Sequence, residues 1–318
     1  MANFTKHGDQ TSTQEYLCTT GLGIHQKRFL LTLNIPISIM TVLGNALIIA
    51  ALTKVSSLHP PSKLLLGCLA STDLSVGLVT RPLRISLFMS PEHSRHCYYI
   101  KILYESIGGM ICGVSVLTVT ATSVDRLLAL MLGLRYRQIV TFKRVWVIVV
   151  TSWLFTTAVA VARFYSYRNA AGIICMTLLF CIVTSIFCYT KIFLRLRHHQ
   201  TQVQDQVNQR QPDEGAISQN IARYRKTVSN ALWIQVTLLA CCLPYGIATA
   251  TVVITGLDTP DIGTVWSVTV SLLLLNSLLN PFLYCWKIRE VRQAVKDTIR
   301  QVNGVIHLTS LGPDVEVT

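Results

Sequence analysis

The sequence predicts an all-α membrane protein, a seven-transmembrane helix bundle with a short amphipathic helix after the seventh span. Of its 318 residues, 51% are hydrophobic and only 14% are charged, whereas soluble chains carry roughly 25% charged residues. The mean hydropathy is +0.47, and the apolar residues form long blocks instead of short amphipathic stripes. These features argue against a soluble enzyme and exclude a disordered chain.

Seven apolar blocks are long enough to cross a bilayer, which takes about 20 residues. They cover residues 29–53, 64–89, 100–131, 145–163, 171–194, 228–255 and 264–286. The polar segment 1–28 contains the sequon Asn3-Phe4-Thr5, so Asn3 is a predicted glycosylation site in an extracellular amino-terminal segment. Since that segment lacks the layout of a cleavable signal peptide, we expect the first span to act as its own insertion signal.

Basic residues indicate the orientation of the bundle. Lys and Arg number 28 against 15 Asp and Glu, which gives a net charge of +13. In a membrane chain this excess is typical of cytoplasmic loops that face anionic lipid, and it does not require nucleic acid. With the amino terminus outside, 19 of the 28 fall on the cytoplasmic side. The sequence therefore predicts a multi-pass plasma-membrane protein that contacts membrane lipid and no nucleic acid.

The longest connection is expected at residues 195–226, where polar residues without an apolar period predict a mobile third inner loop in the cytoplasm. The bundle itself covers residues 29–286. Residues 287–318 begin with apolar side chains at helical spacing and a cationic face. This pattern predicts an amphipathic helix on the inner leaflet, followed by a cytoplasmic tail.

Polar residues inside the apolar blocks are candidates for function, because charge is costly at membrane depth. Asp73 falls near the bilayer midplane, and Asp125-Arg126 ends the third block. Interhelical hydrogen bonding is a sufficient explanation for Asn45. A lone aspartate at the midplane, by contrast, requires a proton, a cation or several hydrogen-bond donors.

Several motifs follow one another in a fixed order along the seven blocks. They are Gly44-Asn45, Leu69-Ala70-Ser71-Thr72-Asp73, Asp125-Arg126-Leu127, Leu134-Arg135-Tyr136, Trp153, Tyr189, Cys241-Cys242-Leu243-Pro244 and Asn280-Pro281-Phe282-Leu283-Tyr284. Over about residues 29–300 the chain resembles the rhodopsin-like (class A) G-protein-coupled receptors. The resemblance implies a receptor that binds an extracellular ligand and activates a heterotrimeric G protein, with no catalytic residue and no enzyme activity of its own.

The resemblance assigns activation switches to these motifs. Arg126 would pair with Asp125 at rest and turn toward the G protein on activation, a role that suits a permanently charged guanidinium. Tyr189 and Tyr284 would support the released arginine, and Pro244 would be the hinge of the sixth helix. The full set of expected switch residues is Asp125, Arg126, Tyr136, Tyr189, Pro244, Asn280, Pro281 and Tyr284.

The resemblance also implies a sodium pocket formed by Asp73, Ser115, Asn276 and Asn280, with Asp73 as the charged metal ligand. Bound Na⁺ would favour the resting state. No other cofactor is expected.

Two departures from the family pattern affect activation. Cys242 stands where most relatives carry a tryptophan switch, so ligand contact must be transmitted by other side chains. Tyr224 stands near the position of an acidic partner for the arginine. A resting lock across those helices is therefore not expected, and elevated basal activity is a hypothesis.

The outer disulfide departs from the pattern as well. Lys101 occupies the position expected for its cysteine, and Cys97 is the nearest cysteine. Cys97 can pair with Cys18, which we favour slightly, pair with Cys175, or remain free. The short second outer loop, about residues 163–171, and a fifth span without proline resemble the melanocortin, adenosine, cannabinoid and lysophospholipid receptors.

The outer half of the bundle bears on the ligand. Residues 264–286 contain no lysine for a retinal Schiff base, and Gly108 stands where amine receptors use an aspartate. Arg81 and Arg84, one turn apart, suggest an anionic group on the ligand. The predicted ligand-binding residues are Arg81, Arg84, Glu105 and Gly108. Lipid acid, nucleotide-like molecule and acidic peptide all remain open, and solvation at the interface is the simpler explanation for Lys101, Arg163 and Arg168.

Two other functions fit the sequence less well. A transporter would show repeats and several charges along one path, whereas only Asp73 lies at depth. A non-signalling or scavenging receptor fits Cys242 in place of the tryptophan, but Asp125-Arg126 and the motif from Asn280 to Tyr284 argue against it.

Overall fold

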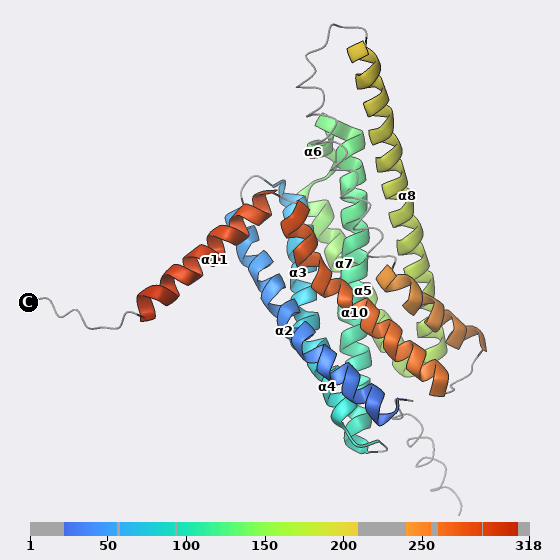
Figure 1. Cartoon of the computed structure of the whole chain (residues 1–318). Coiled ribbons are helices and arrows are strands. Elements are labelled where there is room, and N and C mark those ends of the chain that lie inside the picture. The colour runs from blue at the N-terminus through green and yellow to red at the C-terminus, as the bar shows by residue number, and fades with distance from the viewer. Residues whose placement is uncertain are drawn as a thin grey trace, which may run out of the picture.

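The protein is an elongated bundle of helices, described here by a computed structural model for residues 22–55, 58–92, 94–208, 240–255, 260–287 and 289–310. Within these ranges every regular element is a helix, which confirms the predicted all-α class. Six helices are long and apolar enough to cross a membrane, and a shorter apolar helix covers Ala240–Thr255. The long helices lie side by side (Figure 1).

The elements follow the order of the predicted spans. They are α2 (Ile24–Lys54), α3 (Pro60–Ser75), the π-helical turn η1 (Val76–Thr80), α4 (Arg81–Met89), α5 (Arg95–Leu132), η2 (Gly133–Arg135), α6 (Tyr136–Ile139), α7 (Phe142–Tyr165), α8 (Tyr167–Asn208), the helix Ala240–Thr255, α10 (Pro260–Lys287) and α11 (Arg289–Ser310). Below, the end of the bundle that carries Cys97 is called the outer end, and the end that carries Arg126 is called the inner end.

The second span is one continuous rod made of α3, η1 and α4. Pro82 has no backbone N–H to donate to the carbonyl four residues earlier. The π-helical turn Val76–Thr80 lies directly before it and accommodates this break without ending the helix. Arg81 and Arg84 follow the turn and face the interior of the bundle.

Two connections differ from the sequence prediction. The helix α8 continues to Asn208, so residues 195–208 are helical although the interval 195–226 was predicted as an irregular loop. Helical spacing can continue without apolar residues once a helix leaves the membrane, which is why hydropathy missed it. The second outer loop, predicted at about 163–171, is the single residue Ser166 between α7 and α8. Residues 209–239, including the first part of the block 228–255, lie outside the described residues.

The helix predicted after the seventh span is present and is longer than expected, with 22 residues in α11. Val291 and Ala294 are buried against the bundle. The Lys54 ammonium donates to the Thr298 hydroxyl at 3.1 Å and to the Gln301 side-chain oxygen at 2.6 Å. Figure 1 shows α11 leaving the inner end of the bundle at a wide angle.

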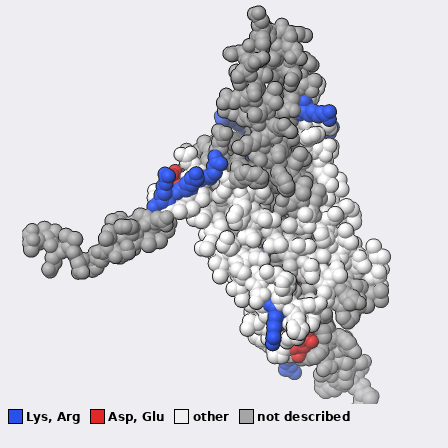
Figure 2. Space-filling model, viewed as in Figure 1, with Lys and Arg blue, Asp and Glu red and all other residues white. Residues whose placement is uncertain are grey.

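On the visible surface, charged side chains avoid the middle of the bundle. On the face drawn in Figure 2, the described Lys, Arg, Asp and Glu residues gather at the two ends and along α11, and the surface between them is uncharged. Large apolar side chains such as Leu154, Phe180 and Phe187 are exposed on the surface of the bundle. This distribution is typical of a surface that faces lipid.

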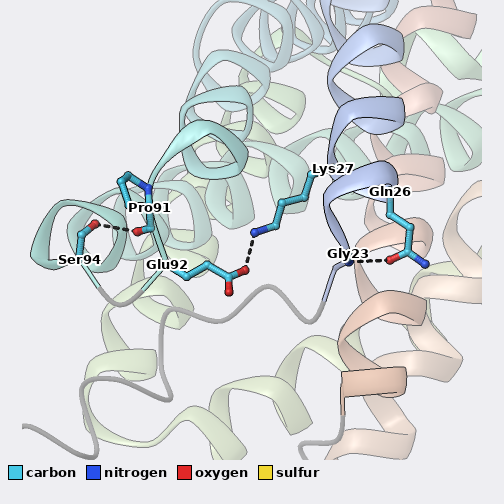
Figure 3. Close-up of polar contacts among 6 residues, drawn as sticks. All are labelled: Gly23, Gln26, Lys27, Pro91, Glu92 and Ser94. Carbon is cyan, nitrogen blue, oxygen red and sulfur yellow. Dashed lines mark hydrogen bonds and ion pairs between the residues drawn. The ribbon is translucent and has the colours of Figure 1, made fainter.

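The outer end is held by a small polar network. Lys27 of α2 pairs with Glu92 in the connection between α4 and α5, and Ser94 begins α5 by bonding back to Pro91 (Figure 3). Cys97 is disulfide-bonded, whereas Cys175 is a free thiol. A Cys97–Cys175 bond is therefore excluded. The favoured pairing with Cys18 stays a prediction, because Cys18 lies outside the described residues, as does Asn3.

Glycine sets the spacing between the first two spans. A methyl group added to Gly77 would lie 2.8 Å from Val42 Cγ2 and 3.3 Å from two backbone atoms of α2. The Ser38 hydroxyl donates to the Gly77 carbonyl at 2.7 Å across the same contact. Gly67, ten residues earlier in α3, has open space instead: a methyl group added there would meet nothing within 4 Å.

We expect Gly77→Ala to lower the thermal unfolding midpoint of the purified protein by about 5 °C, because overpacking costs roughly 2 kcal/mol. The matched change Gly67→Ala should leave the midpoint unchanged or raise it, since alanine favours a helix over glycine by roughly 1 kcal/mol. Differential scanning fluorimetry in the same detergent would measure both. Equal midpoints for the two variants would contradict the close α2–η1 contact.

Candidate functional site

A carboxylate lies fully buried between α3, α5 and α10. Asp73 Oδ1 accepts a hydrogen bond from the Ser115 hydroxyl at 3.1 Å, and Oδ2 accepts one from Asn280 Nδ2 at 2.7 Å. The Ser277 hydroxyl, which the sequence analysis did not single out, also lies beside the carboxylate. Asn276 is buried on α10, but no hydrogen bond to Asp73 from it is among those of the described residues. Three of the four predicted sodium-pocket residues are therefore together.

A second buried contact joins Asn45 to the turn of α10 that precedes Pro281. Proline at 281 cannot donate to the carbonyl of Ser277. Asn45 Nδ2 donates to that carbonyl at 3.0 Å, and to Thr41 O at 2.9 Å. Gly44 permits the approach, since an added methyl group would lie 3.1 Å from the Pro281 ring. The asparagine thus satisfies a backbone group that would otherwise be unbonded in the membrane.

Arg81 and Arg84 are almost completely buried, at 1% and 2% exposure. Arg81 donates to Asn34 Oδ1 at 3.0 Å and to the Leu274 carbonyl at 2.9 Å. Arg84 donates through Nη2 to the Ser267 carbonyl at 2.5 Å and to the Ser271 hydroxyl at 2.8 Å. Their partners on α10 are thus mostly backbone carbonyls, which a sequence does not mark.

The outer half of the bundle encloses a cavity of about 120 Å³ between α5, α7, α8, α10 and the helix Ala240–Thr255. Its wall is mainly apolar and includes Glu105, Gly108, Gly109, Arg163, Tyr245 and Trp266. Gly109 leaves space on the cavity side, because an added methyl group there would meet nothing within 4 Å. The cavity therefore contains two of the four predicted ligand-binding residues, Glu105 and Gly108. Arg81 and Arg84 are not among the lining residues, and their contact with a ligand stays a prediction.

The charges at the cavity wall neutralise each other. Arg163 Nη2 of α7 lies 2.7 Å from Glu105 Oε2 of α5, and each side chain is 16% exposed. The Arg163 guanidinium also lies over the Tyr167 ring, 5.0 Å from its centroid. Sequence reasoning treated Arg163 as an interfacial, solvated residue. The structure instead makes it the counter-ion of Glu105, a pairing of residues 58 positions apart.

Cys242, at the usual place of the tryptophan switch, is 1% exposed and packs with Val116, Leu178 and Cys181. An aromatic contact occurs one turn further out. The Tyr245 and Trp266 ring centroids lie 6.3 Å apart, and both side chains line the cavity. These rings are the aromatic groups on the helix Ala240–Thr255 and α10 that a ligand in the cavity would touch.

At the inner end, the resting Asp125–Arg126 pair expected from the family resemblance is not formed. The Tyr136 hydroxyl donates to Asp125 Oδ1 at 2.6 Å, and the Ser62 hydroxyl donates to Oδ2 at 2.9 Å. Both carboxylate oxygens are thus occupied by neutral donors, and Arg126 is exposed. Burial, followed by the bond to Asp125, raises the pKa of the Tyr136 hydroxyl above its usual value.

For the other predicted switch residues that it describes, the structure gives the position but no activation contact. Tyr189 is buried beside Leu127, Cys188 and Ile192. Pro244 lies within the helix Ala240–Thr255, as a hinge position requires. The side chain of Tyr284 and the whole of Tyr224 lie outside the described residues.

Comparison with known proteins agrees with this arrangement. A family model described as "7 transmembrane receptor (rhodopsin family)" matches residues 44–172 and 163–284. Trace amine-associated receptor 9 of Rattus norvegicus is 25% identical over 288 residues, covering 81% of this chain and 83% of that protein. Melanocortin receptor 5 of Rattus norvegicus is 23% identical, covering 83% and 82%. Melanocortin receptor 4 of Danio rerio is 24% identical, covering 92% and 88%.

These matches span most of the chain and include the melanocortin receptors, to which the short second outer loop already pointed. The family model extends from the first span to the seventh and covers more than half of the residues. The chain therefore belongs to the rhodopsin family of seven-transmembrane receptors.

Proposed function

We propose that this receptor lies in the plasma membrane with its amino terminus outside and activates a heterotrimeric G protein when an extracellular ligand binds. The observation that carries the proposal is the inner end of α5. Arg126 is exposed there because its neighbour Asp125 is held by Ser62 and Tyr136. An exposed, permanently charged side chain at that position is available to a cytoplasmic partner. The receptor performs no covalent chemistry, so nucleotide exchange on the G protein is its output.

The ligand is proposed to have an apolar body with an anionic group. The largely apolar wall of the outer cavity supports the first part. The second part is supported by Arg81 and Arg84, which are buried beside that wall without a carboxylate within 4.0 Å among the described residues. Membrane lipid is a further partner, since α11 buries one side against the bundle and carries Arg292, Lys296 and Arg300 on the remainder.

An amine is the competing ligand class, since one set of relatives is named for trace amines. Glu105 is the acid in the cavity wall that an ammonium group would choose. Its carboxylate is already paired with Arg163 at 2.7 Å. An amine would have to displace a guanidinium from a partly desolvated pair, which costs more than a surface exchange. The anionic ligand is therefore favoured.

Sodium is proposed as an allosteric ion at Asp73. One carboxylate and two hydroxyl groups, those of Ser115 and Ser277, supply the hard oxygen donors that Na⁺ prefers. Asn280 would turn its amide oxygen toward the ion, since its nitrogen now faces Asp73. Bound sodium would favour the conformation in which these groups are close together.

The coupling proposal is tested by basal signalling in cells, read as cAMP and as inositol phosphate. We expect Arg126→Ala to reduce the signal to that of an empty vector at equal surface expression, because the exposed guanidinium at the inner end is lost. Arg137→Ala removes another exposed arginine from the same side and should retain most of the signal. Equal signals from wild type and Arg126→Ala would refute the assigned role and favour a non-signalling receptor.

The sodium proposal predicts that Na⁺ raises the unfolding midpoint of the purified receptor by about 3 °C at tenfold over its dissociation constant. The sodium concentration is raised by replacing choline gluconate with sodium gluconate at constant ionic strength, and the unfolding midpoint is measured at each step. Asp73→Asn should abolish the shift, and Ser115→Ala should weaken it. Ser185→Ala, which removes a buried hydroxyl elsewhere on α8, serves as the control. A sodium shift that survives in Asp73→Asn would place the ion elsewhere.

The role of Arg163 as counter-ion predicts a gain of function. We expect Arg163→Gln to respond to phenethylamine or tyramine at concentrations at least tenfold below any wild-type response, because Glu105 loses its partner. The double variant Glu105→Gln/Arg163→Gln should not respond. G-protein activation in transfected cells is the readout. A wild-type receptor that responds fully to either amine would instead establish the amine as the ligand class.

A further inference from the structure

Two positive charges are buried in the outer half of the bundle without an acidic partner. Among the described residues, the ion pairs join Lys27 to Glu92 and Arg163 to Glu105, and neither includes Arg81 or Arg84. A buried charge is costly unless it is paired or coordinates an ion. The neutral carbonyls of Leu274 and Ser267 hold the two guanidiniums in place but carry only partial negative charge.

Hydrogen-bond donors at the same place are unused. Arg81 Nε, Arg84 Nη1 and Thr80 Oγ1 are all buried, and none has a hydrogen-bond partner in the part of the chain that the structure describes. Thr80 and Arg84 are four residues apart and so lie on one side of the helical rod. Buried donors in native proteins are paired with protein groups, ordered water or a bound ligand, so these three donors within five residues mark a place where an acceptor would bind.

The unused donors adjoin the ligand cavity. Thr80 is part of the cavity wall, together with Tyr104 and Cys112. The Arg84 guanidinium is covered on one side by the Phe88 ring, 5.2 Å from its centroid. An acceptor at this position would therefore be sheltered from water on the outer side and could be reached from the cavity at Thr80.

We propose that Thr80, Arg81 and Arg84 form a binding site for one small monovalent anion, either a carboxylate group or a halide ion. Three donors match the two oxygens of a carboxylate or the single atom of a halide. A phosphate or sulfate would bring four oxygens to three donors and two neighbouring carbonyls. The carboxylate form rests on the proposed function, because it would belong to the receptor's ligand; the halide form does not.

The two sources predict different chemistry at the cavity. A ligand carboxylate would enter past Thr80 and leave its apolar chain between α5 and α7, where Gly109 provides space. A halide would fill the site alone and need no space beyond the three donors. Both would lower the cost of burying two guanidiniums, so both would stabilise the folded receptor.

The test uses the purified full-length receptor in nanodiscs at constant sodium, with chloride, acetate, octanoate or sulfate as the varied anion. We expect a saturable rise of the unfolding midpoint with chloride and acetate, about 3 °C at tenfold over the dissociation constant. Arg84→Gln should abolish the rise. Thr80→Val removes one donor with little change of shape and should weaken the rise. It provides the test should Arg84→Gln fail to fold. Arg168→Gln removes an exposed arginine and should leave the rise unchanged.

Octanoate separates the two sources. If the acceptor belongs to a ligand, octanoate should act at concentrations at least tenfold below acetate, and Gly109→Leu should remove that advantage without affecting chloride. If the acceptor is a free halide, chloride should act below both carboxylates. A rise with sulfate alone that persists in Arg84→Gln is general salting-out and would overturn the site, as would equal midpoints in all four anions. Because neither agonist nor G protein is present, failure here leaves the signalling proposal untouched.

Discussion

The interior of this receptor is organised by the need to satisfy polar groups where no water is present. The side of α10 that faces α2 and α4 carries backbone carbonyls and a hydroxyl that receive bonds from other helices. Arg84 reaches Ser267 and Ser271, Arg81 reaches Leu274, and Asn45 reaches Ser277. The Asn280 amide completes the series by donating to Asp73. Polar bonds therefore join α10 to the first two spans along most of its length.

The other side of the bundle is joined differently. Among the described residues, the helix Ala240–Thr255 meets its neighbours mainly through Cys242, Tyr245 and aliphatic side chains, and a long sulfur bond from Cys175 to Gly246 O at 3.9 Å joins it to α8. Apolar contacts resist sliding less than directional bonds do. Among the described residues, directional polar bonds therefore concentrate between α2, the rod of α3 and α4, and α10, while the contacts of the helix that carries Pro244 are mainly apolar. In the absence of a tryptophan at 242, Tyr245 and Trp266 are the cavity residues through which a ligand can act on it.

Hydropathy predicted long apolar helices, and six of them lie among the described residues. The family resemblance suggested Asp73, Ser115 and Asn280 as one pocket, and the structure brings these side chains together, while sodium binding there stays a prediction. The sequence did not reveal the partners of Asp125. Ser62 and Tyr136 are ordinary polar residues, 63 and 11 positions away, and only their packing brings them to the carboxylate. It likewise missed the Glu105–Arg163 pair and the carbonyl partners of the arginines. Hydropathy also gave no sign that α8 continues to Asn208, because a helix outside the membrane needs no apolar block.

The arrangement of charge along the second span would connect the two proposed ion sites. Asp73 lies one turn below η1, and Arg81 and Arg84 lie directly above it, so the same rod carries a buried negative charge at its middle and two buried positive charges in its outer half. All three side chains bond to α10 or to residues on it. A cation at Asp73 and an anion at the arginines would each change how strongly the rod holds α10, one at the level of Asn280 and the other at Ser267 and Leu274. The two proposed ions, of opposite charge, would therefore act on α10 at two positions along its length. Their effects would combine through that helix.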